Sequence, residues 1–488
     1  MEMQDNKMVL HGVENRAMVW DTSDVLSNHS KPPPEYKPPL DRKPPPEYKP
    51  PAVPELPDHF PAVEGIGHMQ RPKHPTSYSE TLAHLLKGNI ASGMYAMGDA
   101  FKNGGLLLAP FLTVFLGIIC VFNQHLLVNC ANAMRERNKL NYYPGFDDTV
   151  ELCFDAGPPM FRRYAKTGRS AVNFFIITAQ LGFCCVYMVF VTSTTHQILE
   201  NFGYHMDIHL NMVITLVFIM AFIIIRNLKY LAPVSLFATV TMVVGVALTI
   251  YISCDELPPI AARHAIPTLV QLPLFFGTVI YAYEGISLVL PLQTEMRHPD
   301  KFNSPLGVLN VGNIIVTLLL LIMGFIGYLK YGDDVQGSLT LNLPHDNTLS
   351  QCVKIAIAIG ILLTYPIMFY VPVALIWPAV VERWGPFDKP VRYEIILRIL
   401  LCLLTFVLAE VIPDLSLFIS LVGAVSSTAL ALVFPPLCDI SMRQLDGDFG
   451  FLGWRKMVNY LTLLIALFGF CTGTYFSLVH IVQSFGLH

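Results

Sequence analysis

Residues 84–94 read His84-Leu-Leu-Lys87-Gly88-Asn89-Ile90-Ala91-Ser92-Gly93-Met94, an apolar segment interrupted by glycines and polar side chains. A second apolar segment is interrupted in the same way and reads Ile280-Tyr-Ala-Tyr283-Glu284-Gly285-Ile286-Ser287. In lipid every backbone N–H and C=O must be paired, so a broken helix persists only where it lines a polar cavity. The two interruptions therefore predict non-helical backbone around a polar site inside a membrane protein.

The composition of the whole chain agrees with a membrane location. Of its 488 residues, 53% are hydrophobic and only 14% are charged, whereas soluble domains contain about 25% charged residues. From Ser79 onward, the sequence predicts an all-α membrane protein with eleven spans of roughly 20 residues each. They lie near 79–102, 106–130, 170–194, 209–225, 231–252, 269–291, 305–329, 350–377, 393–411, 414–436 and 457–482.

The loops between these segments alternate in basic content, which predicts their orientation. Arg and Lys gather in connections 131–169, 226–230, 292–304, 378–392 and 437–456 and are scarce in the others. The positive-inside rule then predicts a cytosolic N-terminus and an extracellular or luminal C-terminus. The broken segments are the first and the sixth, which are equivalent places in two five-span halves. Such a pair indicates the binding site of a secondary transporter.

Other features of the chain exclude several classes of function. The first residues lack a basic region followed by a short apolar core, so no cleaved signal peptide is expected. A net charge of −4 gives no support for a nucleic-acid partner. No nucleotide-binding loop, metal-ligand cluster or nucleophile elbow occurs, so we expect neither enzyme activity nor a cofactor. Cys254 and Cys352 are predicted to lie at the outer face, where a disulfide can form. The sequence leaves open whether these two pair.

Residues 1–76 differ from the rest of the chain and are predicted to be a disordered cytosolic tail, followed by a transporter domain over residues 77–488. The tail holds 15 of the 36 prolines and has little apolar periodicity. Pro-Pro-Glu-Tyr occurs twice, at Pro33–Tyr36 and Pro45–Tyr48. This motif favours polyproline II and suits a WW domain, such as that of a ubiquitin ligase. The alternative is a stiff, soluble spacer.

The backbone at the two breaks suggests the kind of ligand. A helix that begins after Gly93 offers free N–H groups and a positive dipole end to a carboxylate. Carbonyls released near Gly88 and Gly285 could accept hydrogen bonds from an ammonium group, so a zwitterionic amino acid would satisfy both ends. The predicted substrate-binding residues are Gly88, Asn89, Ile90, Ala91, Ser92, Gly93, Gln180, Tyr283 and Gly285. Close packing of small residues between helices is the alternative explanation for the glycines.

Three ionisable residues inside the spans are candidates for proton coupling. Glu284 is in the middle of the sixth span and could either carry a proton or brace the broken helix through permanent hydrogen bonds. His84 is a candidate because an imidazole can take up and release a proton, although it could also be a packed interior histidine. Asp99, near the end of the first span, is a second possible proton site.

These motifs together resemble the amino acid/auxin permease superfamily, and the chain looks closest to the animal proton-coupled amino acid transporters. The resemblance runs from about Thr81 to the last span. The segments that carry it are His84–Ile90, Phe101–Gly105, Ala179–Cys184, Tyr283–Ile286, His298–Phe302 and Phe369–Pro372. Two positions depart from the usual pattern, with Gly98 in place of a typical proline and Ala91 in place of a glycine.

The resemblance implies a fold of the leucine-transporter type, with a five-plus-five inverted repeat and an eleventh helix. It also implies symport of small neutral amino acids with protons, with His84 as the coupling histidine and Glu284 as the family's sixth-span glutamate. Two other functions remain open: an amino acid sensor that signals through its tail, and a sodium-coupled symporter. Plasma membrane and lysosomal or endosomal membrane are both compatible with the sequence.

Overall fold

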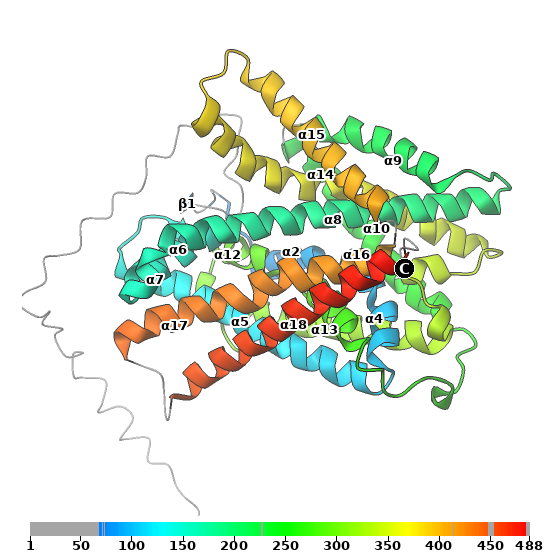
Figure 1. The fold of residues 1–488 in the computed structure, drawn as a ribbon, viewed down its shortest axis with the longest axis horizontal. Helices are drawn as coiled ribbons and strands as arrows, with labels where there is room; N and C mark the ends of the chain where they lie inside the picture. Colours follow the sequence, from blue (N-terminus) through cyan, green and yellow to red (C-terminus); the bar gives the residue numbers. More distant parts are fainter. Residues whose placement is uncertain are drawn as a thin grey trace, which may run out of the picture. The chain divides into compact units, whose positions relative to one another are not determined.

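The computed structural model describes residues 68–70, 72, 74–225, 228–412, 414–447 and 453–484. Contacts divide the chain between Val53 and Pro54, and all described residues belong to the second unit. This unit is almost entirely helical (Figure 1). The Pro-Pro-Glu-Tyr motifs at Pro33–Tyr36 and Pro45–Tyr48 lie outside the described residues.

Eight helices of the described part are long and apolar enough to cross a membrane, when a helix pair broken in its middle is counted once. Their elements are α5 (Leu108–Arg137), α8 (Ala165–Asn201), α10 (Leu228–Ser253), α11 with α12 (Leu272–Ala282 and Ile286–Glu295), α13 (Val308–Tyr331), α14 (Thr348–Trp384), α16 with α17 (Leu415–Val422 and Phe434–Asp446) and α18 (Trp454–Ser484). Each overlaps a predicted span.

The other three predicted spans are also helical but depart from this simple form. The first is divided into α2 (Tyr78–Asn89), α3 (Ser92–Tyr95) and α4 (Met97–Gly104). The fourth, α9 (Ile208–Ile223), has only 16 residues. The ninth, α15 (Pro390–Val411), carries Glu394, Arg398 and Glu410 along its length. The number of eleven spans and the internal repeat therefore stay predictions.

Both predicted breaks are present as interruptions of helical backbone. Helix α2 ends at Asn89, and α3 begins at Ser92 with Ala91 as its extended N-cap residue. Helical structure thus resumes before Gly93 rather than after it, so this detail of the prediction was wrong. In the second break α11 ends at Ala282, and Gly285 is the N-cap residue of α12.

A π-helical stretch lies beside the second break. Between α16 and α17, the backbone is wound as π-helix over Gly423–Ser427 and Ala429–Val433. A Cβ on Gly423 would come within 1.9 Å of the Gly277 carbonyl oxygen, so this segment and α11 are in backbone contact. Wider π-helical turns are frequent at functional sites, and this one supports the helix that leads into Glu284.

The amino-terminal edge of the described part differs from the prediction of a tail that is disordered through residue 76. Strand β1 (His68–Met69) pairs antiparallel with β2 (Tyr143–Pro144), and Thr76 forms a bridge with Met296. The Ser77 hydroxyl then caps α2 in a capping box with Glu80. Two-residue pairings of this kind leave no hydrophobic period in a sequence, so composition could not place this boundary.

Two short helices complete the side at which α2 begins. Helices α6 (Phe146–Ala156) and α7 (Pro159–Arg163) connect α5 to α8. All ten cysteines are free thiols, and Cys254 and Cys352 are both exposed. The structure therefore does not join them, and the possible outer disulfide is absent from it.

Candidate functional site

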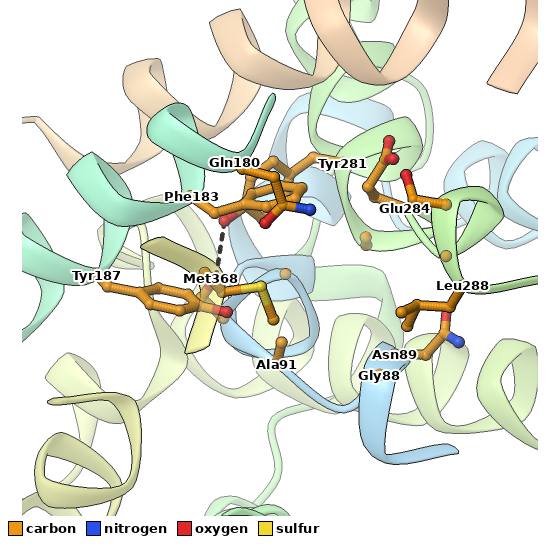
Figure 2. Close-up of a pocket in the computed structure, with 15 residues that line it drawn as sticks. Gly88, Asn89, Ala91, Gln180, Phe183, Tyr187, Tyr281, Glu284, Leu288 and Met368 are labelled. Atoms are coloured by element: carbon orange, nitrogen blue, oxygen red, sulfur yellow. Dashed lines mark hydrogen bonds between the residues drawn. The ribbon is translucent and has the colours of Figure 1, made fainter. Parts of the chain in front are cut away.

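A small cavity lies at the point where the two helix breaks meet (Figure 2). Its volume is about 60 Å³. Residues from α2, α3, α8, α11, α12 and α14 surround it: Gly88, Asn89, Ala91, Ser92, Gly93, Gln180, Phe183, Tyr187, Tyr281, Ala282, Glu284, Gly285, Ser287, Leu288 and Met368. Figure 2 shows Tyr187 and Met368 on one side of the cavity and Glu284, Leu288 and Asn89 on the opposite side.

Glycine is required where the broken helices touch. A Cβ on Gly93 would lie 2.8 Å from the Cα of Ala282, which is too close for any side chain. A Cβ on Gly285 would lie 2.9 Å from the Asn89 side-chain oxygen. The glycines therefore serve close packing, as the alternative explanation proposed, and this same packing brings the two stretches of open backbone together around one cavity.

Polar and aromatic contacts tie the breaks together. The hydroxyl groups of Ser92 and Tyr281 form a hydrogen bond of 2.8 Å, drawn as the dashed line in Figure 2. The Tyr281 ring meets Phe183 of α8 edge to face, with 5.0 Å between the ring centroids. Tyr281 thus links the first broken helix, the second broken helix and α8 at the wall of the cavity.

Three acceptor groups in the cavity wall form no hydrogen bond with the described residues. Asn89 Oδ1, Gln180 Oε1 and both carboxylate oxygens of Glu284 are buried without a hydrogen-bond partner among the described residues. Ser287 and Ser427 lie beside the Glu284 carboxylate. Buried acceptors without donors are costly in a folded protein, so this cluster is suited to a ligand that brings its own N–H or O–H groups.

Helices α8 and α14 supply residues of the cavity wall that were not predicted from the sequence. Phe183 and Tyr187 of α8 line the cavity together with Gln180, and α14 contributes Met368. Positions 180, 183 and 187 share one helix face, because residues three and seven apart lie nearly above one another. Extending the face from Gln180 could have identified these two aromatic residues, whereas no sequence pattern marks Met368.

A larger cavity of about 460 Å³ adjoins the small one. Both are lined by Gly88, Ala91, Tyr187, Leu288 and Met368. The larger cavity continues to His84, Lys87, Ile90 and Glu295. These residues lie toward the side at which α2 begins and α12 ends, which the basic loops predict to be cytosolic. His84 is exposed there, and the structure is open toward this side.

The opposite side is closed by packed side chains. Tyr95 of α3 is fully buried, and its hydroxyl donates to the Met242 carbonyl at 3.1 Å. Its ring lies against Phe190 of α8, with the centroids 6.3 Å apart. Ile357 of α14 is also fully buried. These three side chains form a layer between the cavity and the end at which α14 begins.

Two predicted site residues lie away from both cavities. The Tyr283 hydroxyl donates to the Thr113 carbonyl at 3.2 Å and forms a second hydrogen bond, of 3.0 Å, with the Thr317 hydroxyl, so its side chain points toward α5 and α13. Asp99 lies in α4, where its carboxylate accepts hydrogen bonds from the Ser416 hydroxyl and the Asn103 amide. Asp99 therefore joins α4 to α16 beyond the closed layer instead of lining the central site.

Comparison with known proteins shows the family of this chain. Residues 74–479 match the family described as transmembrane amino acid transporter protein. The proton-coupled amino acid transporter-like protein pathetic of Drosophila melanogaster is 32% identical over 413 residues, which cover 84% of this chain and 87% of that protein. The probable amino acid transporter skat-1 of Caenorhabditis elegans is 25% identical over 418 residues, covering 82% and 89% of the two chains.

Solved structures with a similar fold are also transporters. The inward-facing conformation of Mhp1 superposes with a TM-score of 0.52 at 14% identity, covering 86% of this chain and 92% of that one. Mhp1, a nucleobase-cation-symport-1 family transporter, in a closed conformation with bromovinylhydantoin bound, gives a TM-score of 0.50 at 12% identity, covering 86% and 94%. This likeness concerns the fold alone. By its sequence match over most of its length, the chain belongs to the transmembrane amino acid transporter family and is an integral, multi-pass membrane protein.

Proposed function

We propose that this protein is a secondary active transporter that carries small neutral amino acids together with protons. One observation carries the proposal: acceptor atoms of Asn89, Gln180 and Glu284 lie at one cavity and form no hydrogen bond with the described residues. An amino acid's ammonium group has three donors and no acceptor, so it complements such a cluster. The name of the Drosophila relative, a proton-coupled amino acid transporter-like protein, supports the same class of substrate and driving ion.

The carboxylate of the substrate would bind at the other side of the break. Helix α3 begins at Ser92, and the first N–H groups of a helix have no partner within it. The N–H groups of Ser92 and Gly93 are therefore available to an anionic group at the cavity wall. The breaks thus offer donors and acceptors on different sides of one cavity, which matches the two charged groups of a zwitterion.

The size of the cavity supports a small substrate. A cavity needs roughly 10–15 Å³ to hold a single water molecule, so about 60 Å³ has room for only a few. Phe183, Tyr187, Leu288 and Met368 limit any extension of a ligand beyond its α-carbon. Small side chains should therefore fit best, and the methyl group of Ala91 contributes to this limit.

Glu284 is the proposed site of the coupled proton. Its oxygens are buried and unpartnered, and ionisable groups in such positions within a membrane commonly carry protons. His84 is a second proposed proton site, at the wall of the larger cavity. Because the two cavities share wall residues, a proton released from Glu284 would pass His84 on its way to the predicted cytosol.

The proposed transport cycle is alternating access around the central cavity. The structure represents the state open toward His84, with Tyr95, Phe190 and Ile357 closing the opposite side. Opening of that layer would require α2–α4 and α11–α12 to rock against α8 and α14. A proton at Glu284 and an amino acid at the breaks would lower the barrier to this reorientation by neutralising and pairing the buried groups.

The test is substrate-evoked current in voltage-clamped oocytes at acidic and near-neutral pH, with and without sodium. Surface labelling of an epitope tag must first show that the protein is in the plasma membrane. Inward currents that grow at acidic pH and persist without sodium would support proton symport. Currents that require sodium would favour the sodium-coupled alternative. Amino acid binding without current in a surface-resident protein would favour the sensor, and the predicted Pro-Pro-Glu-Tyr partner would then be tested by WW-domain pull-down.

A further inference from the structure

A lysine is completely buried near the start of α14, far from the central cavity. Lys354 has no exposed surface, and its ammonium group donates to Gln197 Oε1 at 3.2 Å. Among the residues that the structure describes, no carboxylate forms an ion pair with Lys354. Lysine is almost never fully buried unless it is paired, so a neutral amide is a poor permanent partner for this cation.

Two hydroxyl groups on the helix faces of Lys354 and Gln197 also lack partners. Thr194 on α8 and Ser350 on α14 are fully buried, and neither hydroxyl has a hydrogen bond. Ser350 precedes Lys354 by four residues and Thr194 precedes Gln197 by three, so each pair shares a helix face. Helices α8 and α14 pack against each other. Lys354, Gln197, Thr194 and Ser350 are here called the outer polar cluster.

The outer polar cluster continues the helix faces that line the central cavity. On α14, Lys354, Ile361 and Met368 are spaced by seven residues and lie on one face. On α8, Thr194, Tyr187 and Gln180 have the same spacing. The inner members of both series line the cavities. Fourteen residues of helix place Lys354 roughly 21 Å along α14 from Met368.

The cluster lies on the closed side of the molecule, close to solvent. Tyr95, Phe190 and Ile357 form the buried layer between this cluster and the cavity. Beyond the cluster, Gln197 Nε2 donates to Gln336 Oε1 at 3.4 Å, and Gln336 is exposed. Two hydrogen-bonded amides, Gln197 and Gln336, therefore link Lys354 to the predicted outer surface.

We propose that the outer polar cluster is a carboxylate-binding site, which an amino acid occupies on its way from the outer solution to the central cavity. An α-carboxylate is the one anionic group that all neutral amino acids share. An ammonium group with two hydroxyl donors matches it, because charge-assisted hydrogen bonds are strong and directional. In the state described here Gln197 covers the lysine and occupies the place of the carboxylate. This inference rests on the proposed amino acid transport.

The test compares affinities measured from the two sides of the membrane. In Lys354→Gln, the apparent KM for external alanine should rise about tenfold, the effect of losing one charged hydrogen-bond donor. The maximal current and the KM for alanine applied from the cytosolic side of excised patches should stay the same. Lys354→Arg should recover most of the external affinity. Lys330→Met is the matched control, because Lys330 lies at the same end of the bundle and bonds only loop carbonyls.

A second variant keeps the test decisive if Lys354→Gln does not reach the surface. Thr194→Val with Ser350→Ala removes only hydroxyls without partners, and it should raise the external KM a few-fold while leaving the cytosolic KM unchanged. An unchanged external KM in a surface-resident variant would overturn the proposal. A chloride effect would also overturn it. If replacing external chloride by gluconate changes the external KM of the wild type but not that of Lys354→Gln, the site holds chloride instead of the amino acid. If the wild type carries no amino acid at all, the proposed function itself fails.

Discussion

The hydroxyl oxygens of Ser92 and Tyr281 lie 2.8 Å apart and join the two broken helices directly at the cavity wall. One hydroxyl belongs to the first turn of α3 and the other to the last turns of α11. Any substrate that binds between the breaks must therefore lie next to this bond. The Ser92–Tyr281 hydrogen bond fixes the distance between the start of α3, which supplies N–H donors, and the second break, which supplies acceptors.

Removing the Tyr281 hydroxyl should weaken substrate binding without changing the packing of the ring. Tyr281→Phe keeps the edge-to-face contact with Phe183 but loses a buried hydrogen bond, worth about 1 kcal/mol. We expect the KM for alanine to rise roughly fivefold, measured as concentration-dependent current. Tyr283→Phe is the control, because that hydroxyl bonds Thr113 and Thr317 outside the cavity. An equal rise in KM in both variants would contradict a specific role of Tyr281.

Adding one methyl group between the breaks should stop transport. In Gly93→Ala the new Cβ would lie 2.8 Å from Ala282 Cα, and the backbone there cannot move aside. Overpacking of this kind costs about 1–3 kcal/mol, so uptake normalised to surface protein should fall about fivefold or more. Gly360→Ala is the control, since its Cβ would meet neighbours no closer than 3.4 Å. Normal uptake by Gly93→Ala would show that the two breaks separate more widely than the structure indicates.

Shortening one side chain of the cavity wall should allow larger amino acids to be transported. Met368→Ala removes the thioether from the side of the cavity opposite Glu284 (Figure 2). The ratio of leucine to alanine uptake should increase about tenfold, because one or two methylene groups in a pocket are worth about 1–3 kcal/mol. Met188→Ala removes a buried methionine of α8 that does not line the cavity. A similar ratio change in both variants would mean that general loosening, not the wall, controls selectivity.

Neutralising Glu284 should abolish the dependence of transport on pH. If Glu284 takes up the coupled proton, wild-type current increases as the outer solution becomes acidic, since a protonated site is needed for reorientation. Glu284→Gln mimics the protonated form permanently, so pH-dependent current should be lost while exchange of labelled alanine for unlabelled alanine continues. Glu200→Gln, at the exposed end of α8, should retain the wild-type response. A pH dependence that survives in Glu284→Gln would assign coupling elsewhere, with His84 as the next residue to substitute.

The sequence predicted the broken helices and most of the cavity because both follow from local constraints. Gly88, Asn89, Ala91, Ser92, Gly93, Gln180, Glu284 and Gly285 all line the small cavity. Ile90 and His84 line the larger cavity beside it. Glycines and polar groups within a span stand out against an apolar background, since unpaired backbone is so costly in lipid.

Other residues could not be placed from local pattern. Tyr281 and Tyr283 are two residues apart, yet only Tyr281 reaches the cavity. The direction of a side chain near a break depends on where the helix stops, and a shift of one residue turns it by about 100°. Asp99 is likewise an ionisable residue within a span, as a proton site would be. Its hydrogen bonds to Ser416 and Asn103, however, place it at the contact between α4 and α16.

The sequence alone thus determined that the chain crosses a membrane and where its helices must open. These properties come from the cost of burying charge and unpaired backbone, which is paid residue by residue. Only the tertiary structure decided which side chains share a cavity, which side of the cavity is open, and that Lys354 is buried beside hydroxyls without partners. Such properties depend on the rotation and contact of helices far apart in the chain, and no local pattern of residues encodes them.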